Sequence, residues 1–139
     1  MIIAVDFDGT IVRDKYPEIG KEIPFATNTL KMLMQEGHQF ILWTVRHGRT
    51  LTEAVEWCRQ RGVEFYAVNE NFPGEVEGDP EHAYSRKLRV DLFIDDRNVG
   101  GLPDWGTIYQ IIHERRPYAD ILLNGGEHYP QQKRKWWPF

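Results

Sequence analysis

Two aspartates near the start of the chain, Asp6 and Asp8, are the side chains best suited to chemistry. They stand one residue apart in the stretch Asp-Phe-Asp-Gly-Thr, which ends at Thr10. Carboxylates this close repel each other unless a cation, hydrogen-bond donors or a shared proton compensates. Mg²⁺ is the natural candidate, because this hard cation takes one or two carboxylates together with phosphate oxygens. The alternative interpretation is a plain turn, in which Asp and Gly are common.

Polar residues also end two later apolar segments. Residues 39–44 are predicted as a strand that finishes at Thr44, and residues 90–94 as a strand followed by Asp95 and Asp96. Because the carboxyl ends of parallel strands meet at one edge of a sheet, we expect these side chains to gather at a single site. Thr44 taken alone is more often an ordinary strand-end residue.

The elements that must position these residues alternate between strands and helices. Residues 2–5 form an apolar run typical of a strand buried on both faces, and residues 63–68 are a third such segment. Pro24 is expected to open the first helix and Gly37 to end it. A second helix is expected to begin with a capping box at Thr50 and Glu53, to bury Cys58 and to end at Gly62.

A third helix is expected to be capped by Asp104 and to bury a stripe of four residues, Trp105, Ile108, Ile111 and Ile112. A last short strand is expected at residues 121–123.

Three segments are expected to be irregular. Residues 11–22 are interpreted as a loop or small hairpin over the site, carrying Arg13, Lys15 and Tyr16. Residues 69–86 contain several carboxylates without metal-ligand spacing, which favours a solvated acidic loop. The tail at residues 133–139 mixes basic and aromatic side chains, and we expect it to dock on its own domain or on a second copy of the chain.

Composition places the chain among soluble globular proteins of one domain, residues 1–139. The net charge of −4 argues against a general nucleic-acid binder, which would usually be basic. The single cysteine excludes an internal disulfide and fits a reducing compartment. No stretch is long and apolar enough to cross a membrane, and no basic leader precedes the first apolar run, so we expect a cytoplasmic protein.

Taken together, these motifs resemble those of the haloacid dehalogenase (HAD) superfamily. The shared features are an apolar strand running into Asp6-Phe-Asp8-Gly-Thr10, a strand-end Thr44, a Lys at position 87, and an apolar strand running into Asp95-Asp96. All four motifs occur in the family order. Lys87 is the weakest of them, because Lys and Arg are frequent around it and Arg does not replace a point-charge ammonium.

The resemblance implies an α/β fold, Rossmann-like and three-layered (α/β/α), with a mainly parallel sheet. The first strand would be central, with the second and third strands to one side and the acidic fourth strand to the other. It also implies a Mg²⁺-dependent phosphomonoester hydrolase of small phosphorylated metabolites. Asp6 would form an aspartyl-phosphate, and Asp8 would be the general acid and base.

The same resemblance implies the ligands of the site. Asp6, Asp8 (through its main-chain carbonyl) and Asp95 would hold the metal, with Asp96 close by or bound to it through a water. Thr44, Lys87 and Thr10 would contact phosphoryl oxygens. Arg46 follows Thr44 in a loop on the same edge, where it is expected to meet an anion and so to bind phosphate.

Residues 11–24 and 69–86 are both too short for the cap domain that many members of the superfamily carry, so a capless member is expected. Its open site would gain specificity from loops, a bulky substrate or a neighbouring subunit, which leaves a homo-oligomer open. Three other functions remain open: a non-enzymatic module that binds Mg²⁺ or a phosphorylated ligand, a phosphotransferase or mutase, and a nucleic-acid end-processing phosphatase.

Overall fold

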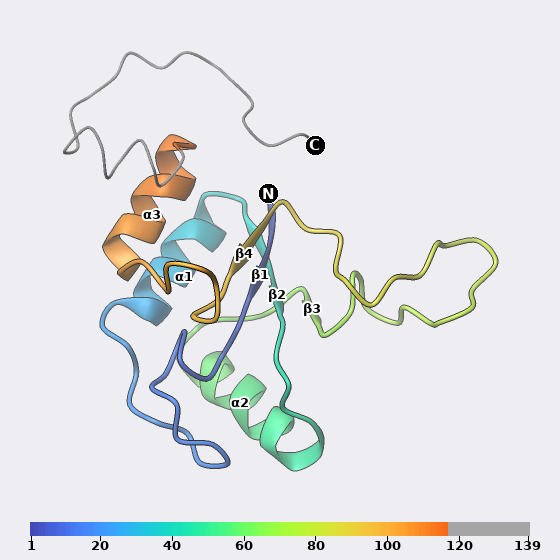
Figure 1. Cartoon of the computed structure of the whole chain (residues 1–139), viewed down its shortest axis with the longest axis horizontal. Helices are drawn as coiled ribbons and strands as arrows, with labels where there is room; N and C mark the ends of the chain where they lie inside the picture. The colour runs from blue at the N-terminus through green and yellow to red at the C-terminus, as the bar shows by residue number, and fades with distance from the viewer. Residues whose placement is uncertain (117–139) are drawn as a thin grey trace.

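A parallel sheet forms the centre of the molecule, whose computed structural model describes residues 1–116 (Figure 1). Its four strands are β1 (Ile2–Val5), β2 (Gln39–Leu42), β3 (Ala67–Val68) and β4 (Leu92–Ile94). They lie in the order β3-β2-β1-β4, and every neighbouring pair is parallel. The predicted strand order is therefore confirmed, with β1 between β2 and β4. All four carboxyl ends lie at one edge of the sheet, as a parallel sheet requires.

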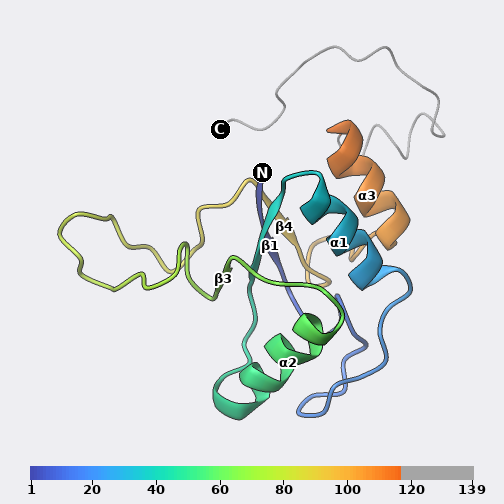
Figure 2. The ribbon, with the colours of Figure 1, turned by 180° about the vertical axis from the view of Figure 1, so that it is seen from behind.

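The three helices described pack on one face of this sheet. They are α1 (Ala26–Gln35), α2 (Gly48–Gln60) and α3 (Trp105–Glu114). Their buried side chains share one core cluster with alternate strand residues such as Ile3, Phe40 and Ile94. The sequence led us to expect helices on both faces. In residues 1–116 the structure is instead an α/β fold with its helices on one side, seen from front and back in Figures 1 and 2.

The opposite face of the sheet is covered by irregular chain. Residues 69–91, here named the β3–β4 connection, contain no helix or strand and project from the body as a long loop (Figure 2). Near its end the connection returns across the sheet, where Leu88 is buried against Ala4, Ile41 and Ala67. One apolar side chain of this connection therefore does part of the covering that a helix usually does in α/β proteins.

Hydrogen bonds show where each helix starts. Asp104 caps α3 as predicted, because its side chain accepts a hydrogen bond from the backbone N–H of Thr107. The capping box predicted at Thr50 is wrong, since α2 already begins at Gly48 and the Thr50 hydroxyl donates to the carbonyl of His47. The start predicted for α1 at Pro24 is also two residues early. The Glu22 side chain accepts from the backbone N–H of Thr27 in the first turn of α1.

Three strands are shorter than predicted: β2 ends at Leu42 rather than at residue 44, β4 begins at Leu92 rather than at residue 90, and β3 is reduced to two residues. Only Ala67 and Val68 pair in β3, although residues 63–68 are a mostly apolar run. Val63 is buried because it packs beneath the end of α2, where its N–H donates to the carbonyl of Cys58. Cys58 is itself fully buried as predicted, and burial raises the pKa of its thiol to about 12.

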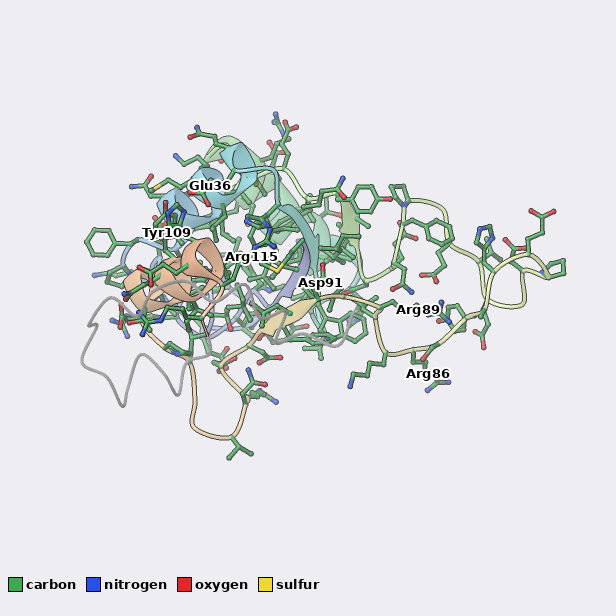
Figure 3. The ribbon with its side chains drawn as sticks, turned by 90° about the horizontal axis from the view of Figure 1, so that it is seen from above. Glu36, Arg86, Arg89, Asp91, Tyr109 and Arg115 are labelled. Atoms are coloured by element: carbon green, nitrogen blue, oxygen red, sulfur yellow. The ribbon has the colours of Figure 1, made fainter. Side chains whose placement is uncertain are left out.

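A small polar cluster joins α1 to α3 on the surface (Figure 3). The Tyr109 hydroxyl donates to Glu36 Oε1 over 2.6 Å, and His113 Nδ1 lies 3.0 Å from the same oxygen. The rings of Tyr109 and His113 stack with centroids 5.1 Å apart. These contacts fix the end of α1 against α3.

The predicted strand at residues 121–123 and the basic aromatic tail at residues 133–139 lie outside the described residues. Within residues 1–116, every helix is too short or too polar to cross a lipid bilayer.

Candidate functional site

Three aspartates converge where β1 and β4 end side by side. Asp6 follows Val5, Asp95 follows Ile94, and these two strand residues are paired in the sheet. One carboxylate oxygen each from Asp6, Asp95 and Asp96 lies within 4.8 Å of the other two. We name these residues the aspartate triad. The sequence predicted that these side chains gather at one edge of a parallel sheet, and the family resemblance implied that the two strands are neighbours.

The loop after β1 is built closely around Asp96. The Thr10 hydroxyl donates to Asp96 Oδ1 over 3.2 Å and accepts from the backbone N–H of Asp96 over 3.1 Å. Gly9 has a φ of +80°, and a Cβ at this position would stand 2.3 Å from Asp96 Oδ2. The Thr10 carbonyl accepts from the indole N–H of Trp105, which is buried at the start of α3. Thr10, predicted as a phosphate ligand, is therefore a buried support of the triad.

The electrostatics of the triad fit a divalent cation. The pKa of Asp6 is raised from 3.8 to about 7, chiefly by burial. A hydrogen bond from the backbone N–H of Phe7 lowers this pKa, and the nearby Asp95 and Asp96 carboxylates raise it. Such a shift means that the ionised form lacks compensating positive charge. Three carboxylates within reach of one point are the hard oxygen donors that Mg²⁺, Mn²⁺ or Ca²⁺ prefers. The triad could therefore hold a metal ion.

Asp8 is held by Arg46. The Nε and Nη2 groups of Arg46 donate to the two carboxylate oxygens of Asp8, each over 2.7 Å. The Arg46 side chain is fully buried and that of Asp8 is 13% exposed. Hydrogen bonding to Asp8 raises the pKa of Arg46 above its ordinary value. This bidentate pair fixes the direction of the Asp8 carboxylate.

The other donors of Arg46 bind backbone carbonyls. Nη1 donates to the carbonyls of Pro17 and Thr50, each over 3.2 Å, and Nη2 donates to the carbonyl of Glu18 over 2.8 Å. All five N–H groups of the guanidinium are thus engaged. The sequence predicted that Arg46 would bind phosphate. The anion that it binds is Asp8. Because Asp8 and the three backbone carbonyls engage every N–H group, none is left for a phosphoryl oxygen in this arrangement.

Thr44 lies at the end of β2, beside the end of β1. Its backbone N–H donates to Asn69 Oδ1 over 2.8 Å, and its hydroxyl accepts from the backbone N–H of Arg46 over 3.1 Å. Asn69 follows β3 with a φ of +54°, a left-handed conformation that Asn tolerates better than most residues. Thr44 therefore lies on the same sheet edge as the triad and helps to shape the loop that carries Arg46.

Lys87 lies beside a ring of β4. It is exposed on the β3–β4 connection, with its Nζ 5.9 Å from the ring centroid of Phe93 in β4. Its neighbours Arg86 and Arg89 follow the same connection, away from α1 and α3 (Figure 3). In this arrangement Lys87 packs on the β4 side chain two positions before Asp95.

Two supports of the site were missed in the sequence. Asn69 carried a usable signal, because it is a polar residue directly after a short strand, as Asp6 and Asp95 are. Trp105 carried no such signal, because its position among the apolar residues of α3 indicates packing alone. Its hydrogen bond to Thr10 depends on how α3 folds back over the β1 loop.

Comparison with known proteins gives one informative match. No protein-family model matches this chain, and no curated protein matches it. A solved structure described as that of a conserved protein from Bacteroides thetaiotaomicron is similar to it, with a TM-score of 0.81 and 60% sequence identity. The match covers 94% of this chain and 98% of the other. The chain therefore belongs to the same family as this conserved protein of Bacteroides thetaiotaomicron.

Proposed function

We propose that the protein is a Mg²⁺-dependent phosphomonoester hydrolase of the haloacid dehalogenase type, without a cap domain. One observation carries the proposal: the carboxylates of Asp6, Asp95 and Asp96 converge at the carboxyl ends of two neighbouring parallel strands. Ligands of parallel α/β sheets bind at this edge. The motif order along the chain, from Asp6 through Thr44 and Lys87 to Asp95, supports the same function.

The residues present suit a magnesium ion. The triad would hold it through carboxylate oxygens, and the main-chain carbonyl of Asp8 would add a further oxygen ligand. When bound, the ion would offset the repulsion between the carboxylates and a phosphate group and stabilise the charge that develops in transfer. It would also supply the positive charge that the raised pKa of Asp6 indicates is missing.

The chemical steps are assigned to Asp6 and Asp8. A carboxylate oxygen of Asp6 attacks phosphorus in line, the bond from phosphorus to the leaving oxygen breaks, and Asp8 gives that oxygen a proton. A water then attacks the aspartyl-phosphate, Asp8 takes a proton from the water, and inorganic phosphate leaves with Asp6 restored. Thr44 and Lys87 would contact the phosphoryl oxygens, with the exposed Lys87 turning from Phe93 towards the site.

The proposed substrates are small phosphorylated metabolites of the cytoplasm. The connections that could carry a cap are the loop between β1 and α1 and the β3–β4 connection, and neither contains a helix or a strand long enough to form a domain. The leaving group would then be selected by the loops at the sheet edge or by a second subunit. The net charge of −4 weighs against nucleic-acid ends as substrates.

A second candidate is a non-enzymatic module that binds a metal ion at the triad. The observation that favours it is the placement of the two predicted phosphate-binding cations. Arg46 is saturated by Asp8 and backbone carbonyls, and Lys87 packs on Phe93. A module of this kind would bind Mg²⁺ and release no phosphate.

The test is phosphate release from a panel of phosphomonoesters, with Mg²⁺ and with a chelator, for the wild type and the Asp6→Asn variant. We expect Mg²⁺-dependent turnover in the wild type and none in Asp6→Asn. Asp79→Asn is the matched control, because Asp79 is a carboxylate of the β3–β4 connection outside the triad, and it should keep full activity. Calorimetric Mg²⁺ binding without turnover on any ester would favour the binding module, and full turnover in Asp6→Asn would contradict the assigned nucleophile.

A further inference from the structure

Arg46 connects three parts of the chain that meet at the site. Its side chain binds Asp8 in the loop after β1, the carbonyls of Pro17 and Glu18, and the carbonyl of Thr50 in the first turn of α2. Pro17 and Glu18 belong to the turn of residues 12–22, here named the β1–α1 hairpin. Backbone contacts between Val12 and Glu22, and between Arg13 and Lys21, close this hairpin.

Two aromatic rings enclose the guanidinium. Its central carbon lies 5.1 Å from the ring centroid of Phe7 and 5.2 Å from that of Tyr16. Phe7 is fully buried between Asp6 and Asp8, whereas Tyr16 is half exposed on the β1–α1 hairpin. Buried arginines of this kind are held by cation–π contacts as well as by hydrogen bonds. The position of Asp8 is thus tied to the position of the hairpin through one side chain.

We propose that Arg46 is a positioning residue: it orients the Asp8 carboxyl for proton exchange and makes that orientation depend on the docked β1–α1 hairpin. This inference rests on the proposed hydrolase function, in which Asp8 exchanges protons with the leaving oxygen and with water. Each Asp8 oxygen gives one lone pair to Arg46 and has a second lone pair. On one oxygen, this second position carries the proton that Asp8 gives to the leaving oxygen, and it then takes up the proton of the attacking water.

The physical reason is the loss of freedom of the Asp8 side chain. A carboxyl held by two hydrogen bonds stays in one rotamer, and proton transfer requires the donor and acceptor atoms to be within hydrogen-bond reach. Without Arg46, the Asp8 carboxyl would sample other directions, and the Pro17 and Glu18 carbonyls would lose their donor. A positioning role therefore predicts a defect that is larger for substrates whose leaving group needs a proton.

Two esters of similar size separate this role from a merely structural one. The leaving group of p-nitrophenyl phosphate departs readily as an anion, whereas the alkoxide of benzyl phosphate must be protonated. The parameter to measure is kcat/KM, because it reports the steps up to release of the leaving group. In Arg46→Lys we expect kcat/KM for benzyl phosphate to fall by roughly 10- to 100-fold, which is part of the roughly 10²- to 10⁴-fold that general acid–base catalysis contributes. The kcat/KM for p-nitrophenyl phosphate should change much less.

A matched control exists on α2. Arg59 makes a bidentate pair with Glu56, over 2.8 and 2.6 Å, but both side chains are exposed. Arg59→Lys should leave kcat/KM unchanged for both esters. If Arg46→Lys does not fold, Tyr16→Leu supplies the second variant, because it removes only the half-exposed ring over the guanidinium. It should shift the ratio of the two kcat/KM values in the same direction by a smaller factor.

The outcomes are distinguishable. An equal fall for both esters in Arg46→Lys, or no fall, would overturn the positioning role while leaving the hydrolase function in place. If only Tyr16→Leu folds, a ratio of the two kcat/KM values equal to that of the wild type would likewise overturn the positioning role and leave the hydrolase function in place. A folded wild type that releases phosphate from neither ester nor from any of the wider panel would overturn the hydrolase function and this inference together.

Discussion

At Gly9 the requirement for glycine has two causes, which come from the backbone and from a neighbouring carboxylate. The φ of +80° disfavours any residue with a Cβ, and an added Cβ would meet Asp96 Oδ2 at 2.3 Å. Gly74 offers a comparison, because its φ is +82° and nothing lies within 4 Å of an added Cβ. An alanine at position 9 therefore destabilises the fold more than an alanine at position 74, by the free energy needed to move Asp96.

We predict that Gly74→Ala lowers the free energy of unfolding by about 1 kcal/mol, from backbone strain alone. Gly9→Ala should lower it by roughly 1–3 kcal/mol more, the usual cost of overpacking. Urea unfolding of the two variants measures the difference. Mg²⁺ should also stabilise Gly9→Ala against heat less than it stabilises Gly74→Ala. Equal destabilisation would show that Asp96 moves aside at no cost.

Residue types at strand ends were readable from the sequence, but their partners were not. The sequence predicted that Asp6, Asp95 and Asp96 lie at one edge of a parallel sheet, and the family resemblance implied that the two strands before them are neighbours, as they are. The partner of Arg46 could not be predicted, because Asp8 lies 38 residues away and the hairpin carbonyls carry no sequence signal. Backbone acceptors are the same for every residue, so only the folded chain shows which ones a buried arginine reaches.

At the scale of elements, apolar patterns predicted the helices well and their starts poorly. The buried stripe of α3, from Trp105 to Ile112, is as expected, and so are the glycines that follow α1 and α2. The start of α2 was missed because Thr50 binds back to the carbonyl of His47 from inside the helix. Capping residues can make either kind of hydrogen bond, and sequence alone does not distinguish them.

The surface cluster between α1 and α3 predicts a pH dependence of stability. The hydrogen bond from Tyr109, with His113 nearby, lowers the pKa of Glu36 below its ordinary value of 4.5. A lowered pKa means that the folded protein holds the proton less tightly than the unfolded chain does. The ionised Glu36 therefore stabilises the folded protein above about pH 4.5, and this stabilisation is lost as the pH falls through the lowered pKa of Glu36.

Glu36→Gln removes this contribution. The melting temperature of the wild type should exceed that of Glu36→Gln at pH 7, and the two should converge as the pH falls through the lowered pKa of Glu36. The effect should be small, since the groups are close to solvent. Thermal melts followed by circular dichroism measure it. A gap that stays constant from pH 7 to pH 3 would show that Glu36 acts through its shape rather than its charge.

For the whole molecule, the two faces of the sheet are covered differently. Three helices cover one face, while Leu88 of the β3–β4 connection reaches the other and packs on Ala4, Ile41 and Ala67. The resemblance to the haloacid dehalogenase superfamily implied two helical layers, one on each face of the sheet. No periodic pattern marks Leu88 as a core residue, since it stands between Lys87 and Arg89 in a polar segment.

Leu88→Ala tests this arrangement. The side chain is 5% exposed, so its truncation should lower the free energy of unfolding by roughly 2–5 kcal/mol. Val76 is the matched control, because it is an apolar residue of the same connection and 64% exposed. Val76→Ala should change the free energy of unfolding by less than about 0.5 kcal/mol. Similar values for the two variants in urea unfolding would contradict the role of Leu88.

The burial of Cys58 makes the protein convenient for site-specific labelling. It is the single cysteine of the chain, and burial holds its thiol protonated well above neutral pH, so a maleimide would react with it slowly. A cysteine introduced on the surface, for example by Val45→Cys at a side chain that is 91% exposed, would be the one reactive thiol. A fluorophore or spin label there would report movements of the loop between β2 and α2, with the native cysteine left in place.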